Sequence, residues 1–153
     1  MFEQAARFVG LSCLGLASGM ALCVLLVQRV GTDDGQFYTQ LMQIMSRALT
    51  VPGPALGAFG LIAMVTDATL LYMRSGGIAL WLVGAAILLS LVALALTKFG
   101  HFPINDRILG WVPTKPPADW RAVQSQWSAL HMGRTICATG SFALLVLSNL
   151  LRR

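Results

Sequence analysis

Residues 77–97 read GIALWLVGAAILLSLVALALT, a run without a single charged side chain. At about 1.5 Å per helical residue, this run is long enough to cross the hydrocarbon core of a bilayer, which is about 30 Å thick. Three more apolar segments, at about 8–30, 56–73 and 129–150, qualify as membrane spans in the same way. The sequence therefore predicts an all-α integral membrane protein, a four-helix bundle in which residues 1–153 form a single membrane domain.

The composition of the chain agrees with this class. Hydrophobic residues make up 56% of the 153 positions, charged residues make up 11%, and the mean hydropathy is +0.71. Ordinary soluble domains carry about 25% charged residues. The net charge of +5 is spread over loops and ends without a basic run, which disfavours nucleic acid as a partner. Membrane lipids are the expected surroundings.

The order of the spans fixes which segments share a side of the membrane. Residues 73–77 are too short to cross, so the second and third spans form an antiparallel hairpin. Four crossings place both termini on one side. The count of basic residues is ambiguous, because the other side holds more of them, spread over longer segments: Arg29, Arg47, Lys98, Arg107, Lys115 and Arg121. The side with the termini is denser, with four in very few positions: Arg7, Arg74, Arg152 and Arg153. Because basic residues concentrate on the cytoplasmic side, we expect a multi-pass protein with cytoplasmic termini.

A polar stretch separates the first span from the second. Four side chains recur there at spacings of four, three and four residues: Gln36, Gln40, Gln43 and Arg47. Such spacing places them on one face of a helix. Because residues 36–49 are too polar to span, we expect an interfacial amphipathic helix, with Asp33 and Asp34 as N-cap candidates.

A second polar stripe opens the last apolar segment. Its side chains fall on one face of a helix from about residue 120 to 150: Trp120, Gln124, Trp127, His131 and Arg134. The topology brings the beginning of this helix, preceded by Asp119 as an N-cap candidate, to the same side as the 36–49 helix and the long 98–119 loop. Within that loop, His101 and Asn105 offer an imidazole and an amide. We expect a pocket at this end, although an aromatic belt alone also places tryptophans at an interface.

Metal-ligating residues are sparse. A site built on His101 and His131 would lack clear third and fourth ligands, because Asp106 and Asp119 have no recognisable ligand spacing. We therefore predict no metal and no other cofactor. Asp67 lies inside the second span, where a carboxylate is a functional candidate, but a pairing with Arg74 two turns later is the simpler expectation.

These residues, in this order, resemble the anthrone oxygenase-like family of small four-helix membrane proteins, long catalogued as a domain of unknown function. The resemblance rests on residues 40–48 followed by proline, on Pro103-Ile104-Asn105, and on Trp127 with His131 and Arg134. Members with an assigned activity oxidise an anthrone to an anthraquinone with O2. The resemblance implies that Asn105, Trp127, His131 and Arg134 are site residues.

Four further substrate contacts follow from position: His101, Trp120, Gln43 and Arg47. We expect a hydrophobic aromatic substrate, an anthrone or a similar molecule. In our hypothesis His131 removes the acidic proton, Arg134 and Asn105 stabilise the oxyanion, and Trp127 stacks on the ring together with Trp120.

Two other functions fit the same fold. In the first alternative, the chain is a non-catalytic accessory subunit of a larger membrane complex. Its partner surfaces would then be Gly15, Gly19 and the 36–49 helix. In the second it binds a lipid or a quinone-like ligand without catalysis. The sequence also leaves a homo-oligomer open.

Overall fold

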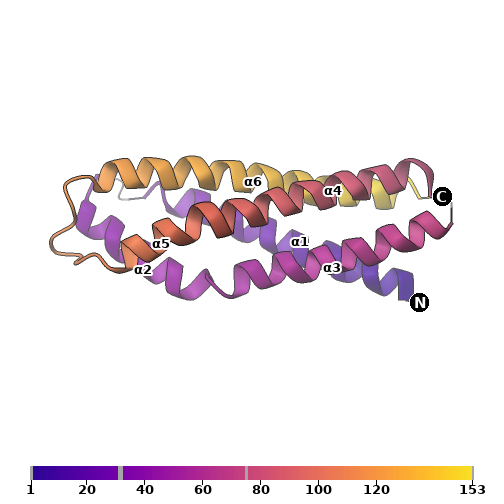
Figure 1. Cartoon of the computed structure of the whole chain (residues 1–153), viewed down its shortest axis with the longest axis horizontal. Helices are drawn as coiled ribbons and strands as arrows, with labels where there is room; N and C mark the ends of the chain where they lie inside the picture. The colour runs from indigo at the N-terminus through magenta and orange to yellow at the C-terminus, as the bar shows by residue number, and fades with distance from the viewer. Residues whose placement is uncertain (1, 31–32, 75, 153) are drawn as a thin grey trace.

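The computed structural model describes residues 2–30, 33–74 and 76–152, and every regular element within these ranges is a helix. The elements, in chain order, are α1 (Phe2–Val27), α2 (Gly35–Leu49), α3 (Pro52–Met73), α4 (Gly77–Ala95), the π-helix η1 (Leu96–His101), α5 (Phe102–Leu109) and α6 (Trp120–Leu150). Four helices are long and apolar enough to cross a membrane: Glu3–Val27, Pro52–Met73, Gly77–Leu109 and Trp120–Leu150. They run side by side, with both termini at one end of the bundle and α2 and α5 at the other (Figure 1). The predicted fold class is confirmed, and the protein is a multi-pass integral membrane protein.

The third span continues further than the sequence suggested. The loop predicted from residue 98 is wrong as far as residue 109, because α4 passes through η1 directly into α5. Within η1 the hydrogen bonds reach back five residues, and the N–H of Phe102 donates to the carbonyl of Thr97. Pro103 follows in the first turn of α5 and, having no N–H, donates no hydrogen bond to the preceding turn. The irregular connection is therefore confined to residues 110–119.

Small hydroxyl side chains join the helices where the membrane core offers no water. Ser141 donates to the carbonyl of Ala86 in α4 at 2.7 Å, and Ser148 donates to that of Ala79 at 3.1 Å. Such bonds and close van der Waals packing hold helices together in lipid. These contacts align α6 antiparallel to α4.

Glycines bring α1 close to its neighbours at some positions only. A Cβ at Gly15 would lie 3.3 Å from the Phe142 ring, and a Cβ at Gly60 in α3 would lie 3.1 Å from Leu14. Gly19 is exposed, and a Cβ there would meet nothing within 4 Å. Gly15 and Gly19 together suggest a small-residue face that another helix can approach closely. Within the bundle, such a close approach is found at Gly15 but not at Gly19.

Asp67 is buried at the end of the bundle that carries the termini. Its carboxylate accepts two hydrogen bonds from Arg152, at 2.7 and 2.5 Å, and lies 3.5 Å from Nε of Arg7. The expected pairing with Arg74 is wrong, because Arg74 pairs with Glu3. The partner comes from the end of α6, which sequence proximity does not reveal.

The N-cap expectation holds for one helix of two. Oδ1 of Asp34 accepts hydrogen bonds from the N–H groups of Gln36 and Phe37 at the start of α2. Asp119 makes no such bond to α6 and instead pairs with Arg107 at 2.6 Å. The charge of Arg107, in the last turn of α5, draws that carboxylate away from the start of α6.

Candidate functional site

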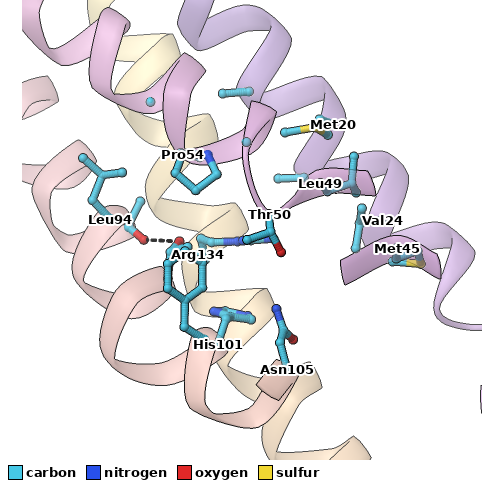
Figure 2. Close-up of a pocket in the computed structure, with 18 of the residues that line it drawn as sticks. Met20, Val24, Met45, Leu49, Thr50, Pro54, Leu94, His101, Asn105 and Arg134 are labelled. Carbon is cyan, nitrogen blue, oxygen red and sulfur yellow. Dashed lines mark hydrogen bonds between the residues drawn. The ribbon is translucent and has the colours of Figure 1, made fainter. Parts of the chain in front are cut away.

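A cavity of about 120 Å³ lies between the helices at the α2 end of the bundle. Its lining is mostly apolar and comes from α1, α2, α3, α4, η1, α5 and α6. Eight side chains with hydrogen-bonding groups interrupt that lining: the hydroxyls of Ser46, Thr50, Ser90 and Thr97, and the larger groups of His101, Asn105, Trp127 and Arg134. Figure 2 shows Arg134, His101 and Asn105 gathered together, with Met20, Val24, Met45 and Leu49 across from them. The polar stripe of α6 and the η1–α5 segment therefore meet at one apolar cavity.

His101 owes its orientation to the π-helical turn that carries it. Its Nδ1 lies 3.1 Å from the carbonyl oxygen of Leu96, five residues earlier. A carbonyl can only accept, so Nδ1 carries the proton and Nε2 carries a lone pair. The residue is 1% exposed, and Nε2 has no partner among the described residues. His101 therefore lines the cavity and has one ring nitrogen, Nε2, without a hydrogen-bond partner in the described chain.

His131 lies behind the cavity lining, and both of its ring nitrogens are hydrogen-bonded. Nε2 donates to the carbonyl of Ala21 in α1 at 3.0 Å, and Nδ1 accepts from Nη2 of Arg134 at 2.8 Å. The side chain is fully buried and does not line the cavity. His131 thus links the backbone of α1 to the guanidinium of Arg134.

Trp127 joins the two histidines and Asn105 into one cluster. Its ring stacks on His131, with centroids 4.8 Å apart and planes at 23°, and meets His101 edge-on at 5.1 Å. Nε1 of Trp127 donates to Oδ1 of Asn105 at 2.8 Å. Because that bond assigns the amide oxygen, the NH2 group of Asn105 remains as a donor for a ligand.

Arg134 enters this cluster as a cation without a counter-charge. Its Nη2 donates to His131, and its Nε has no partner within the described ranges. All six acidic residues of the chain lie in those ranges, and none comes within 4 Å of the guanidinium. The cavity therefore combines one free imidazole nitrogen with one uncompensated positive charge.

Three residues expected to contact the substrate lie elsewhere. Gln43 donates to the carbonyls of Ile108 and Trp111, at 3.0 and 2.9 Å, and so ties α2 to the end of α5. Arg47 is exposed, and Trp120 packs against Tyr38 with ring centroids 5.7 Å apart. None of the three lines the cavity.

The opening of the cavity was not expected from the sequence. The lining residues Thr50, Pro54, Leu94 and Phe102 keep exposed surface. They lie at the α2–α3 junction and on the α4–η1–α5 helix, and Figure 2 shows Pro54 between Leu94 and Thr50. The signal in the sequence was the run 51–54, Val-Pro-Gly-Pro, which breaks the chain between α2 and α3.

The two histidines do not offer a pair of metal ligands. Their ring centroids are 5.9 Å apart, but Nδ1 of His131 is already occupied by Arg134. Across residues 2–30, 33–74 and 76–152, no group of three or more His, Cys, Asp or Glu side chains is arranged to hold a metal ion. Asp106 and Asp119 are exposed at the surface.

A sequence model of the family described as anthrone oxygenase matches residues 40–144. The chain belongs to the anthrone oxygenase family. The match extends from α2 to the later part of α6 and includes every polar side chain of the cavity described above. No curated protein and no solved structure matches the chain. The resemblance noted in the sequence is thus confirmed.

Proposed function

We propose that this protein uses O2 to oxidise an acidic methylene of a hydrophobic aromatic, anthrone-like substrate to a ketone. In the overall reaction, one methylene group and one molecule of O2 give one carbonyl group and one molecule of water. The observation that carries the proposal is that His101, whose Nε2 has no partner, and Arg134, whose guanidinium pairs with no carboxylate, both line one apolar cavity. A base and a group that stabilises an oxyanion are what this reaction needs from a protein.

The first step is removal of a methylene proton by Nε2 of His101. The electron pair left behind delocalises onto the substrate oxygen, which Arg134 and the NH2 group of Asn105 stabilise. The electron-rich carbon then reduces O2 and binds it, forming a hydroperoxide. Loss of the second methylene proton together with hydroxide releases water and leaves the C=O group. The four electrons lost by carbon reduce both oxygen atoms, so no further oxidant is required.

This assignment gives the two histidines different roles. Sequence reasoning assigned proton abstraction to His131, but both of its nitrogens are hydrogen-bonded and its ring lies behind the cavity wall. We propose that His131 is a positioning residue, which holds the guanidinium of Arg134 at the cavity. Trp127 is then placed to stack on the flat substrate and to fix the amide of Asn105.

The test is oxygen consumption and quinone absorbance with an anthrone, using protein in lipid nanodiscs. His101→Gln should lower kcat by about a hundred- to ten-thousand-fold, the usual contribution of a general base. Arg134→Gln should lower it by about a hundred- to a thousand-fold, as for loss of an oxyanion donor. Arg47→Gln, at an exposed arginine outside the cavity, is the matched control and should leave turnover unchanged. Full activity in His101→Gln would disprove the role of His101, and a wild-type protein without O2-dependent turnover would disprove the oxidation itself.

We also propose that the cavity lies on the non-cytoplasmic side, because the opposite end holds Arg7, Arg74 and Arg152. Labelling intact cells with a membrane-impermeant maleimide tests this orientation. In a cysteine-free background, Arg121→Cys should react and Gln4→Cys should not, since both positions are exposed at opposite ends of the bundle. The reverse pattern would show that the termini are outside.

A further inference from the structure

Two hydroxyl side chains that line the cavity take no part in the proposed reaction. They are Ser90 in α4 and Thr97 in η1, and they are buried, with 5% and 8% of their surface exposed. A hydroxyl group donates one hydrogen bond and can accept two. The direction of its proton therefore decides which groups of a ligand it can bind.

Ser90 donates its proton to α6. Oγ of Ser90 lies 2.8 Å from Oγ of Ser141, and Ser141 itself donates to the carbonyl of Ala86 at 2.7 Å. The sulfur of Met64, 4.0 Å from Oγ of Ser141, is a much weaker acceptor. Because the single proton of Ser141 goes to the carbonyl, Ser90 is the donor within the serine pair. Toward the cavity, Ser90 can only accept.

Thr97 donates its proton to its own helix. Oγ1 of Thr97 donates to the carbonyl of Ala93 at 2.9 Å. His101, one turn later, is in the same condition, since its Nδ1 proton goes to the carbonyl of Leu96 and its Nε2 carries a lone pair. The cavity-lining residues Ser90, Thr97 and His101 therefore offer hydrogen-bond acceptors and no free proton.

The size of the cavity relates these acceptors to a ligand. Its volume of about 120 Å³ is close to the roughly 150 Å³ of an engineered apolar cavity that accepts benzene. At about 1.5 Å per residue, Thr97 lies about 6 Å from His101 along the helix, and Ser90 lies about 10 Å further. The first distance is about the length of a benzene ring with substituents on opposite sides. A ring with one edge beside His101 therefore brings its far substituent level with Thr97.

We infer that Thr97 and Ser90 are specificity-determining residues, which accept hydrogen bonds from neutral hydroxyl groups of the ligand. Thr97 selects a hydroxyl group on the enclosed ring, and Ser90 selects one that lies deeper in the bundle. An ether or carbonyl oxygen at either place would meet a lone pair with no proton between the two atoms. That the ligand is oxidised at a methylene beside His101 rests on the proposed function, whereas the selection of a hydroxyl group does not.

The test uses two ligands that differ in this group alone, 2-hydroxyanthraquinone and 2-methoxyanthraquinone. Neither has a methylene to oxidise, so binding is measured without turnover. Quenching of tryptophan emission gives their affinities for protein in lipid nanodiscs, in acidic buffer where the hydroxyl keeps its proton, and empty nanodiscs correct for partition into lipid. The quantity compared between variants is the ratio of the affinity for the hydroxy ligand to that for the methoxy ligand.

This ratio should fall in the double variant Thr97→Val/Ser90→Ala. One net hydrogen bond contributes about two- to tenfold to binding, so we expect a fall of about that size. The double variant covers both places that the hydroxyl group can occupy, and the two single variants show which one it uses. Neither substitution leaves a buried donor unpaired, because Ser141 still donates to Ala86 and the carbonyl of Ala93 still accepts from the N–H of Leu96.

Two further variants serve as controls. Thr97→Ser keeps the hydroxyl group and should keep the ratio of the wild type. Thr66→Val removes a threonine hydroxyl that donates in the same way, to the carbonyl of Ile62 at 3.0 Å, but lies outside the cavity lining. It should therefore leave the ratio unchanged.

An unchanged ratio in the double variant would overturn the inference, and so would an equal fall in Thr66→Val. A wild-type protein that binds neither ligand would overturn it as well. A protein that selects the hydroxy ligand through Thr97 or Ser90 but consumes no O2 with an anthrone would keep the inference and refute the proposed function. A protein that oxidises anthrones and keeps its ratio in the double variant would do the reverse.

Discussion

Replacing Asp67 by asparagine should destabilise the bundle strongly without altering the cavity. The Asp67 side chain is 1% exposed and that of Arg152 is 9% exposed, so the substitution leaves a guanidinium buried without its anion. Removing one partner of a buried ion pair costs about 3–5 kcal/mol. Ser148 still accepts from Arg152 at 2.9 Å, and Arg7 keeps Glu3, so we expect the lower end of this range, about 3 kcal/mol.

The free energy of unfolding is measured by helical circular dichroism during titration of mixed micelles with a denaturing detergent. Asp119→Asn is the matched control, because the Arg107–Asp119 pair is about half exposed on both sides and such pairs contribute about 1 kcal/mol or less. In the double variant Asp67→Asn/Arg152→Gln, the loss should be smaller than the sum of the two single losses, since the unpaired charge is gone.

Asp67 is far enough from the cavity that its substitution should affect the stability of the fold but not the turnover. Asp67 lies ten positions after the lining residue Gly57 on α3, about 15 Å at the helical rise of about 1.5 Å per residue. Folded Asp67→Asn protein should therefore keep wild-type turnover. A loss of stability no larger than that of Asp119→Asn would refute the reasoning, because it would mean that Arg152 finds equivalent solvation elsewhere.

Three other predictions follow from contacts outside the cavity. Tyr38→Phe should leave stability unchanged or slightly higher, because the buried hydroxyl has no partner in the described chain. Burial also raises the pKa of the Tyr38 hydroxyl, so this variant should lose the phenolate absorbance that develops only in strong alkali. Asp34→Ala should lower the free energy of unfolding by about 1 kcal/mol through loss of the α2 cap, while Asp33→Ala, one residue earlier, should not; equal losses would contradict the cap. Gly60→Ala should cost about 1–3 kcal/mol in the same assay, because its Cβ would press on Leu14. Gly19→Ala should be neutral or stabilising, and a comparable loss there would show that Gly19 also has a close neighbour.

The helices could be predicted wherever the hydropathy or the polar spacing of a segment alone indicates its structure. The second span was expected at 56–73 and is found at Pro52–Met73, and the polar helix was expected at 36–49 and is found at Gly35–Leu49. Hydropathy and the spacing of glutamines need no knowledge of tertiary contacts, because lipid and water select each face of a helix separately. The same reasoning brought the η1–α5 segment and the beginning of α6 to one end of the bundle.

The arrangement inside the cavity was not predictable in this way. A π-helical turn has no strong sequence pattern, and Pro103 indicated a break rather than the start of a further helix. That turn sets the proton of His101 on Nδ1 and leaves Nε2 free. Likewise, nothing in the spacing of His131 and Arg134 reveals that the carbonyl of Ala21, 110 residues earlier, occupies the other nitrogen of His131. Sequence reasoning found these residues but could not decide which histidine was free to act.

The two buried charges of the bundle show how its ends differ. At the end that carries the termini, Asp67 has its charge balanced by Arg152 and Arg7, and the carboxylate is closed off from any ligand. At the other end, Arg134 donates to the neutral Nδ1 of His131 and lines the cavity. A fold that can bring two arginines to one carboxylate would stabilise Arg134 in the same way if stability alone mattered. An arginine without a carboxylate partner at a cavity is the arrangement that the proposed oxyanion stabilisation requires, because apolar surroundings strengthen the attraction between opposite charges.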